Sequence, residues 1–199
     1  MYMTGTFSPT FGLNFSSSSF ICSSVGGFAA VSELLAVMDN LNYSAPGNTT
    51  GTPTLIGGLF YFQSQAQGQI VSTTNTFQKC NTTMEGTVFY LYKGQNLIDS
   101  YSFFGSNAGV KGQIYCDSCT ASFDFSTFNY IVAYKASLVY LKGSSDGLSV
   151  AFNNCSIING YSVGDGGAVA AEGSGIGLVA FKDCGMISYF TAGGNGGFF

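Results

Sequence analysis

The stretch "SLVYLKGSSDGLSVAFNNCSIINGYSV", residues 137–163, is followed by a second version of itself, "GAVAAEGSGIGLVAFKDCGMISYFTA", residues 167–192. With one gap, the two copies align a Gly-Leu pair, an Ala-Phe pair and a cysteine, which is Cys155 in the first copy and Cys184 in the second. A unit of roughly 30 residues is too small to bury an apolar face alone, so it must stack on its neighbours. The repeat therefore indicates a solenoid.

The same register extends toward the N-terminus through a small residue that opens each unit. These opening residues are Gly27, Gly58, Gly86, Gly112, Ser137, Gly167 and Gly197. Two places later every unit has an apolar residue, and four places later it has an uncharged one, so alternate side chains of one strand point inward. The sequence predicts an all-β parallel solenoid of about seven coils, each 25–31 residues long, with like side chains stacked in columns.

The residue pattern of the last two units resembles that of a known group of proteins. "FNNCSI" and "GGA" in residues 152–168, and "FKDCGM" and "GGF" in residues 181–198, are similar to the repeats of polymorphic outer membrane proteins and of protist surface β-helix proteins. Three strands and two turns in about 28 residues, with glycine at the corners, resemble one coil of the pectin-lyase-like superfamily. The resemblance implies a right-handed parallel β-helix.

The domain organisation follows from the repeat. We expect one domain over residues 1–199, with residues 1–26 as an N-terminal coil or lead-in and residues 27–199 as the repeated coils. The segment "VSELLAVMDNL", residues 31–41, is compatible with a short helical excursion. Phe198 and Phe199 begin a new inward strand with no cap after it, and solenoids need covered ends. We therefore expect the chain to be a fragment of a longer protein.

Composition excludes several classes of function. All six basic residues are lysine and the net charge is -4, so the arginines that read phosphate and guanine are missing and nucleic acid is not an expected partner. The longest apolar runs are broken by glycine and fall short of the ~20 residues of a spanning helix, so no membrane span is expected.

A catalytic centre is also not expected. The chain has no histidine and no arginine, and its ten acids do not pair at a spacing of two, which argues against a polysaccharide hydrolase or lyase site. We interpret the acids as solvated residues, and we expect no catalytic residue, cofactor or metal.

The six cysteines are candidates for disulfide bonds. They are Cys22, Cys80, Cys116, Cys119, Cys155 and Cys184. "CDSC", residues 116–119, lacks the second half-site of a zinc centre, so it is interpreted as a local disulfide or as two unrelated cysteines. Cys155 and Cys184 stand at equivalent places in adjacent coils, where they are either bridged or an unbridged column of small buried residues.

Five acceptor sequences for N-glycosylation, all with a permitted middle residue, favour an extracellular protein. The acceptors are Asn14, Asn42, Asn48, Asn81 and Asn154. The even number of cysteines suits the same oxidising environment. The first 20 residues are not a recognisable secretion signal, so a secreted protein would have its start upstream.

Outward-facing aromatic residues suggest a contact surface. Three places past the opening residue, four successive units have an aromatic residue: Tyr61, Phe89, Tyr115 and Tyr140. We expect these residues to form an exposed stripe covered by a partner, by sugar rings or by loops of the same chain.

The features together predict an extracellular structural or adhesive protein, a glycosylated surface rod or fibril component. Its expected partners are further copies of itself or other components of a cell surface. Two alternatives stay open. One is a carbohydrate-active enzyme, a lyase or hydrolase, with catalytic residues elsewhere in a longer chain, and the other is a carbohydrate-binding module that uses the aromatic stripe.

Overall fold

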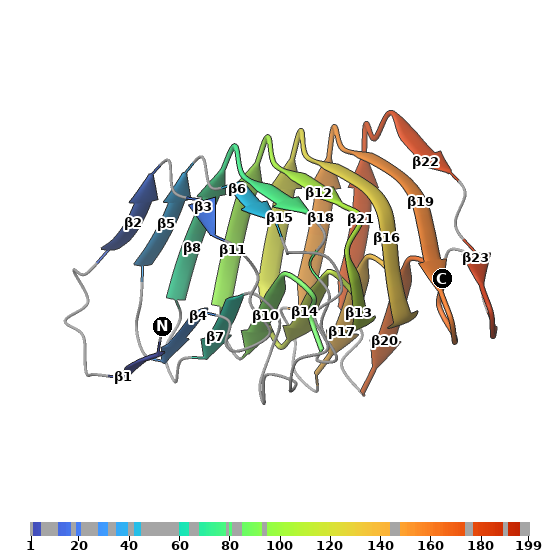
Figure 1. Ribbon diagram of the computed structural model, residues 1–199. Helices are drawn as coiled ribbons and strands as arrows, with labels where there is room; N and C mark the ends of the chain where they lie inside the picture. The colour runs from blue at the N-terminus through green and yellow to red at the C-terminus, as the bar shows by residue number, and fades with distance from the viewer. Residues whose placement is uncertain are drawn as a thin grey trace.

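The computed structural model describes residues 2–4, 12–16, 19–20, 28–31, 35–39, 42–44, 60–63, 68–78, 80, 85–92, 95–143, 148–173, 177–188 and 191–195. All the regular secondary structure in these residues is β-strand, arranged in three parallel sheets. Figure 1 shows the strands of each sheet side by side, with the colour running along the stack from the N-terminus to the C-terminus.

Two of the sheets have seven strands each. Sheet A contains β1 (Tyr2–Thr4), β4 (Phe28–Val31), β7 (Phe60–Gln63), β10 (Phe89–Tyr92), β14 (Ile114–Asp117), β17 (Val139–Lys142) and β20 (Val169–Glu172). Sheet B contains β2 (Gly12–Ser16), β5 (Leu35–Asp39), β8 (Gly68–Thr73), β11 (Gln95–Ser100), β15 (Thr120–Asp124), β18 (Ser149–Asn153) and β21 (Leu178–Lys182).

The third sheet, sheet C, is less regular. It contains β3 (Ser19–Phe20), β6 (Asn42–Ser44), β9 (Thr76–Gln78), β12 (Phe103–Gly105), β16 (Thr127–Lys135), β19 (Ser156–Ser162) and β22 (Met186–Ser188), while β13 (Ala108–Lys111) pairs with β16 and β23 (Thr191–Ala192) pairs with β19. The chain passes through sheets A, B and C in turn, and each strand pairs in parallel with its equivalent one coil later. The predicted all-β parallel solenoid is confirmed.

Columns of stacked aromatic rings fill the interior. Phe104 and Phe128, equivalent residues of sheet C, stack with their ring centroids 4.4 Å apart. Phe123 and Phe152 of sheet B stack at 5.1 Å and meet Phe128 edge-on. All four rings are completely buried. Each buried phenylalanine contributes about 1.5–3 kcal/mol to folding, so these columns stabilise the stacking of coils.

The register of two coils differs by one residue from the prediction. In sheet A, strand pairing aligns Phe28, Phe60, Phe89, Ile114, Val139 and Val169 in one column, whereas the opening residues had placed Ala29 and Val88 in it. Of this column, the side chains of Phe89, Ile114, Val139 and Val169 are described, and they lie in the core. Gly86 and Gly112 do occupy the same corner of successive coils, with φ of 68° and 65° and hydrogen bonds in register. The turn after Gly112 is one residue shorter, because Gly112 precedes Ile114 by two positions and Gly86 precedes Phe89 by three. Strand pairing sets the register, and a glycine corner does not fix it.

Residues 35–39, in the segment interpreted as a short helical excursion, form strand β5. This strand pairs in parallel with β2 and β8, and its backbone hydrogen bonds therefore belong to sheet B. The lead-in at residues 1–26 contributes strands to all three sheets, beginning with β1, and the coil expected to open at Gly197 lies outside the described residues.

The corner between sheets B and C has a left-handed residue in each described coil. These residues are Thr74, Tyr101, Phe125, Asn154 and Asp183, with φ between 52° and 56°, and we call them the corner row. Backbone hydrogen bonds connect successive members: the amide of Tyr101 donates to Asp124 at 2.9 Å and that of Phe125 donates to Asn153 at 3.0 Å. The residue that follows each member turns inward and is buried or half-buried.

Candidate functional site

The predicted aromatic stripe is a tyrosine ladder on the outer face of sheet A. Tyr61 pairs in register with Tyr90, Tyr90 with Tyr115, and Tyr115 with Tyr140. The rings of Tyr90 and Tyr115 stack at 4.4 Å, and those of Tyr115 and Tyr140 at 5.6 Å. Phe89 does not belong to this ladder; it points into the core and is completely buried, because the register of its coil differs by one residue.

The stripe is covered rather than exposed in the part of the chain whose side chains are described. Tyr115 is 1% exposed and Tyr140 is 3% exposed. The ammonium of Lys111 lies 4.6 Å from the centroid of the Tyr140 ring and 5.7 Å from that of Tyr115, and it forms a 2.5 Å ion pair with Glu85. Residues of the same chain thus occupy this surface, and coverage by the same chain was one of the three alternatives left open.

The pKa values of two ladder tyrosines and of a neighbouring carboxylate are shifted by their surroundings. Burial raises the pKa of Tyr115 and of Tyr140 well above the usual range, so both phenols stay protonated. The hydroxyl of Tyr140 donates a hydrogen bond to Glu172, and this contact together with Lys111 lowers the pKa of Glu172. The arrangement keeps the phenols protonated and stabilises the ionised form of Glu172.

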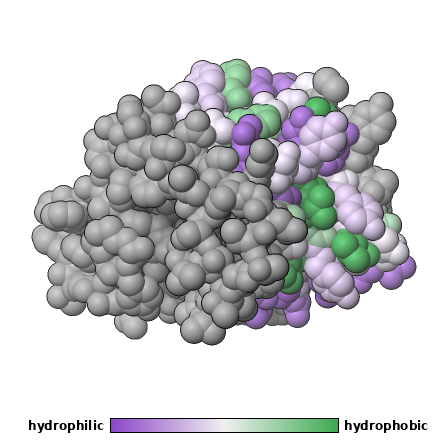
Figure 2. All heavy atoms as spheres, viewed as in Figure 1, coloured by the Kyte–Doolittle hydropathy of each residue, from purple (hydrophilic) through white to green (hydrophobic). Residues whose placement is uncertain are grey.

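Exposed aromatic side chains lie elsewhere: Tyr101 and Phe125 in the corner row, and Tyr130, Tyr134 and Tyr161 in strands of sheet C. Tyr101 is 60% exposed and Phe125 is 51% exposed, and their rings stack face to face at 5.1 Å with an angle of 5° between the planes. Over the described part of the face in Figure 2, hydrophobic and hydrophilic residues are interspersed and form no continuous apolar patch. The Tyr101–Phe125 pair is an exposed platform of two stacked rings.

Sequence reasoning missed this pair because alternation by two would place Phe125 on the same side as Phe123, in the core. A signal was present in the aligned column, since the equivalent residues are Asn154 and Asp183. Asparagine and aspartate adopt the left-handed conformation more readily than other non-glycine residues, so this column is typical of a corner.

A second unexpected feature is a buried carboxylate. Asp99 is completely buried on the inner face of β11, in register with Ser72 and Phe123, although all acids were expected to be solvated. Its oxygens accept hydrogen bonds from the hydroxyls of Ser72 at 2.5 Å, Ser102 at 2.8 Å and Ser126 at 2.7 Å. The expectation was wrong for Asp99, because a set of hydroxyl donors on three coils replaces water around the carboxylate.

The donors to the three serine hydroxyls fix the direction of this network. The side-chain amide of Asn75 donates to Ser72, the backbone amide of Asn75 to Ser102, and the backbone amide of Ser102 to Ser126. Each serine oxygen already accepts a hydrogen bond, so its single proton is directed at Asp99. This arrangement suits the ionised carboxylate. Burial nevertheless raises the pKa of Asp99 to about 6, against the opposing effect of the three serine hydrogen bonds.

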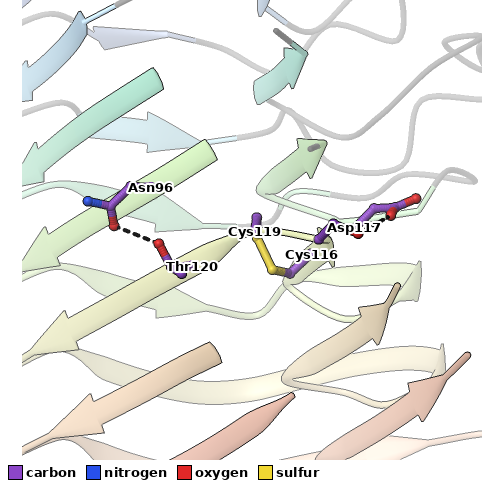
Figure 3. The surroundings of a disulfide bond; sticks show 6 residues. Asn96, Cys116, Asp117, Cys119 and Thr120 are labelled. Carbon is purple, nitrogen blue, oxygen red and sulfur yellow. Dashed lines mark hydrogen bonds between the residues drawn. A yellow bond between two sulfur atoms is a disulfide. The ribbon is translucent and has the colours of Figure 1, made fainter. Parts of the chain in front are cut away.

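Two of the cysteines form a disulfide. Cys116 and Cys119 are bonded across the corner between β14 and β15 (Figure 3), which confirms the local bridge as the correct alternative for "CDSC". Figure 3 also shows the hydrogen bond of 3.0 Å from the hydroxyl of Thr120 to the side chain of Asn96 in the preceding coil. A loop of four residues is short, so the bond fixes the shape of this corner and constrains the unfolded chain little.

Cys155 and Cys184 directly follow Asn154 and Asp183 of the corner row, and they form a column that is not bridged by a disulfide. Both are thiols, and each Sγ donates to a backbone carbonyl of the preceding coil: Cys155 to Phe123 at 3.3 Å and Cys184 to Phe152 at 3.4 Å. Burial raises the pKa of Cys155 to about 12. Cys80 is buried, with its Sγ 3.7 Å from the carbonyl oxygen of Gln78, and Cys22 lies outside the described residues.

The structure describes the five acceptor asparagines to different extents. Asn14 lies in β2 and Asn42 in β6, where only the backbone is described, while Asn48 and Asn81 lie outside the described residues. Asn154 is the one acceptor whose side chain is described, and it is exposed in the corner row.

Two features are absent from the described residues. None of these residues forms a helix of the length and hydrophobicity needed to cross a membrane. Within the same ranges, no three His, Cys, Asp or Glu side chains are grouped as a metal site would require.

Comparison with known proteins gives no match among protein-family models, curated proteins or solved structures. Strand pairing alone therefore establishes the parallel solenoid, and the resemblance to the pectin-lyase-like superfamily stays an interpretation of the repeats.

Proposed function

We propose that this chain is a rigid segment of an extracellular glycoprotein with a structural or adhesive role. The observation that carries the proposal is the in-register pairing of every sheet strand with its equivalent in the next coil. Each coil adds about 4.8 Å to such a stack, and all three sheets resist bending together. A body built in this way serves as a spacer that holds surface features at fixed intervals.

Two features favour the extracellular location. The Cys116–Cys119 disulfide suits an oxidising compartment, where such bonds persist. Asn154 presents an acceptor side chain to solvent at a corner, where a glycan adds bulk without disturbing a sheet. Glycans at the five acceptors would cover the sides of the rod and leave its ends free for other copies or cell-surface components.

The proposal is tested by secretion from a eukaryotic cell line, with the chain fused behind a signal peptide. Mass spectrometry of glycopeptides measures occupancy at Asn14, Asn42, Asn48, Asn81 and Asn154, and negative-stain electron microscopy measures the shape of the particles. We expect occupied acceptors and straight rods or filaments of constant width. Failure of the protein to leave the cell, or secretion with all five acceptors empty, would contradict the proposal.

The filament and the single rod are two forms of the same function. End-to-end contact between copies is heterologous, so it propagates unless the rotation closes a ring. Filaments whose length grows with concentration would identify a fibril component, and rods of one length at all concentrations would identify a surface spacer.

A further inference from the structure

The Tyr101–Phe125 platform has one face without a ring partner among the described residues. The two rings are parallel and 5.1 Å apart, close to the spacing of neighbouring coils, so they stack along the corner row. Tyr101 covers one face of the Phe125 ring. The opposite face of that ring is directed along the row toward the next coil, and the next member of the row is Asn154.

Asn154 stands where a third ring of the stack would lie. Its φ of 52° matches the 54° of Phe125, and the amide of Phe125 donates to the carbonyl of the adjacent Asn153 at 3.0 Å. Equal backbone conformations in register give the two side chains parallel directions. In the described part of the chain, the side-chain amide of Asn154 has no hydrogen-bond partner, and it is followed by Cys155 and Ser156, which complete an acceptor sequence.

We propose that the first sugar of an N-glycan on Asn154 packs its C–H face against the open face of the Phe125 ring. The inference rests on the proposed extracellular, glycosylated state of the chain. A pyranose attached to the amide nitrogen continues the stack begun by Tyr101 and Phe125, and its apolar C–H groups replace water on an exposed ring. On the other side of the sugar, the exposed carboxylate of Asp183 is available to accept a hydrogen bond from a hydroxyl or acetamide group.

The stacking of coils accounts for the left-handed conformation, because Thr74, Asn154 and Asp183 share it along the corner row. Tyr101 and Phe125 differ from these residues in exposing more than half of a large aromatic side chain there. A sugar on Phe125 gives the ring a buried contact that the protein alone does not provide.

The test is a double-mutant cycle on protein secreted from eukaryotic cells and trimmed enzymatically to one N-acetylglucosamine. The four proteins are the wild type, Phe125→Ala, Ser156→Ala and the double variant; Ser156→Ala removes the acceptor sequence and keeps Asn154. We expect loss of the sugar to lower the Tm by about 2–4 °C when Phe125 is present, the shift typical of one lost favourable contact in a chain of this size. In the Phe125→Ala background we expect a shift below about 1 °C.

The matched control is Tyr130→Ala. Tyr130 is also left-handed and 62% exposed, but it lies within β16 and outside the corner row, so this change should leave the effect of the sugar intact. Upfield shifts of the sugar ring protons in the NMR spectrum, lost in Phe125→Ala, give a second readout. This readout holds even if Ser156→Ala alters the fold.

The outcomes separate this inference from the proposed function. The inference is overturned if Asn154 carries a glycan but loss of the sugar changes the Tm equally with and without Phe125, and the sugar protons show no upfield shift. The glycoprotein proposal then still stands. The absence of a glycan on Asn154, with other acceptors occupied, also overturns the inference and leaves the glycoprotein proposal standing. A third outcome also overturns the inference: free chitooligosaccharide binds the Ser156→Ala protein, Phe125→Ala abolishes this binding, and the double-mutant cycle shows no coupling to the attached sugar. The platform would then bind an external carbohydrate. All five acceptors empty contradicts both proposals.

Discussion

The hydroxyl of Ser126 donates a 2.7 Å hydrogen bond to the carboxylate of Asp99 in the preceding coil, and both side chains are completely buried. The bond belongs to a network that crosses three coils, since Ser72 and Ser102 donate to the same carboxylate. The core of this solenoid therefore contains a titratable group, in a column whose next members are the phenylalanines Phe123 and Phe152.

Asp99 should make stability depend on pH. Burial raises its pKa from 3.8 to about 6 in the folded chain, so the folded state binds the proton more tightly than the unfolded state. The resulting stabilisation is fully present below about pH 4, falls as the pH rises through 6, and is lost above it. Two pKa units correspond to about 3 kcal/mol at most. Urea unfolding from pH 4 to pH 8 measures this change.

The variant Asp99→Asn should remove the fall in stability between pH 4 and pH 7, because the amide does not titrate. The exposed Asp183 provides the control, since Asp183→Asn should keep the wild-type slope over the same range. A wild-type profile that is flat, or that rises with pH in this interval, would contradict the assignment of a raised pKa to Asp99.

Removal of the Ser126 hydroxyl should destabilise the fold and raise the pKa of Asp99 above 6. The variant Ser126→Ala deletes a donor to the carboxylate and also the acceptor for the amide of Ser102, so a cost of about 1–3 kcal/mol is expected. Because the Ser126 hydrogen bond lowers the pKa of Asp99, its loss should shift the pH midpoint of the unfolding profile upward. Chemical denaturation at several pH values measures both effects.

Ser122→Ala is the matched control for this variant. Ser122 lies in the same strand region but is half-buried, and its hydroxyl contacts only the Asp124 side chain, at 3.5 Å. We expect a change within about 0.5 kcal/mol and no shift of the pH midpoint. Equal losses in the two variants would show that the Asp99 network contributes nothing specific.

The solenoid could be predicted because a repeated column of apolar residues has one geometric solution, which strand pairing confirms. The register could not be predicted fully, since the turn after Gly112 is one residue shorter than the turn after Gly86 and both corners begin with glycine. The error moved Phe89 from the core to the predicted surface stripe. A one-residue slip exchanges the two faces of a strand, so a small error in register becomes a large error in exposure.

The buried position of Asp99 and the exposed position of Phe125 were not predicted from the sequence, for a reason that differs from the register error at Phe89. Asp99 lies in β11 and Phe125 directly follows β15, and side-chain chemistry favours an acid outside and a phenylalanine inside. Asp99 lies inside because serines from three coils converge on it, and Phe125 lies outside because the corner row reverses its direction. Neither fact is local, so each needed the stacking of coils to be known.

The thiols of Cys155 and Cys184 should differ in reactivity. Cys155 is completely enclosed and burial raises its pKa to about 12, whereas Cys184 is partly exposed. Since the thiolate is the reactive form, iodoacetamide at pH 8 should modify Cys184 in the native protein and Cys155 only after unfolding. Peptide mapping by mass spectrometry measures both rates. Native-state modification of Cys155 at the rate of Cys184 would contradict the buried column.

Gly112 should resist substitution by alanine. A methyl group at this position would lie 2.7 Å from the carbonyl oxygen of Ile114 and 2.9 Å from the amide nitrogen of Tyr140, and both of these are backbone atoms held in sheet A. Ala136 occupies the next coil's corner with φ of 50°, so the left-handed backbone alone does not exclude a side chain. The overlap is the decisive term, and we expect Gly112→Ala to cost about 1–3 kcal/mol, the range of overpacked sites.

Gly185→Ala is the control for the Gly112 prediction, because a methyl group there has no neighbour within 4 Å among the described residues and its backbone is not left-handed. This variant should change the free energy of unfolding by no more than about 0.5 kcal/mol. Urea denaturation of the two variants against the wild type gives the comparison. Similar stabilities for Gly112→Ala and Gly185→Ala would mean that the coils separate to admit the methyl group, and that the stacking in sheet A is looser than the strand pairing of Ile114 with Val139 requires.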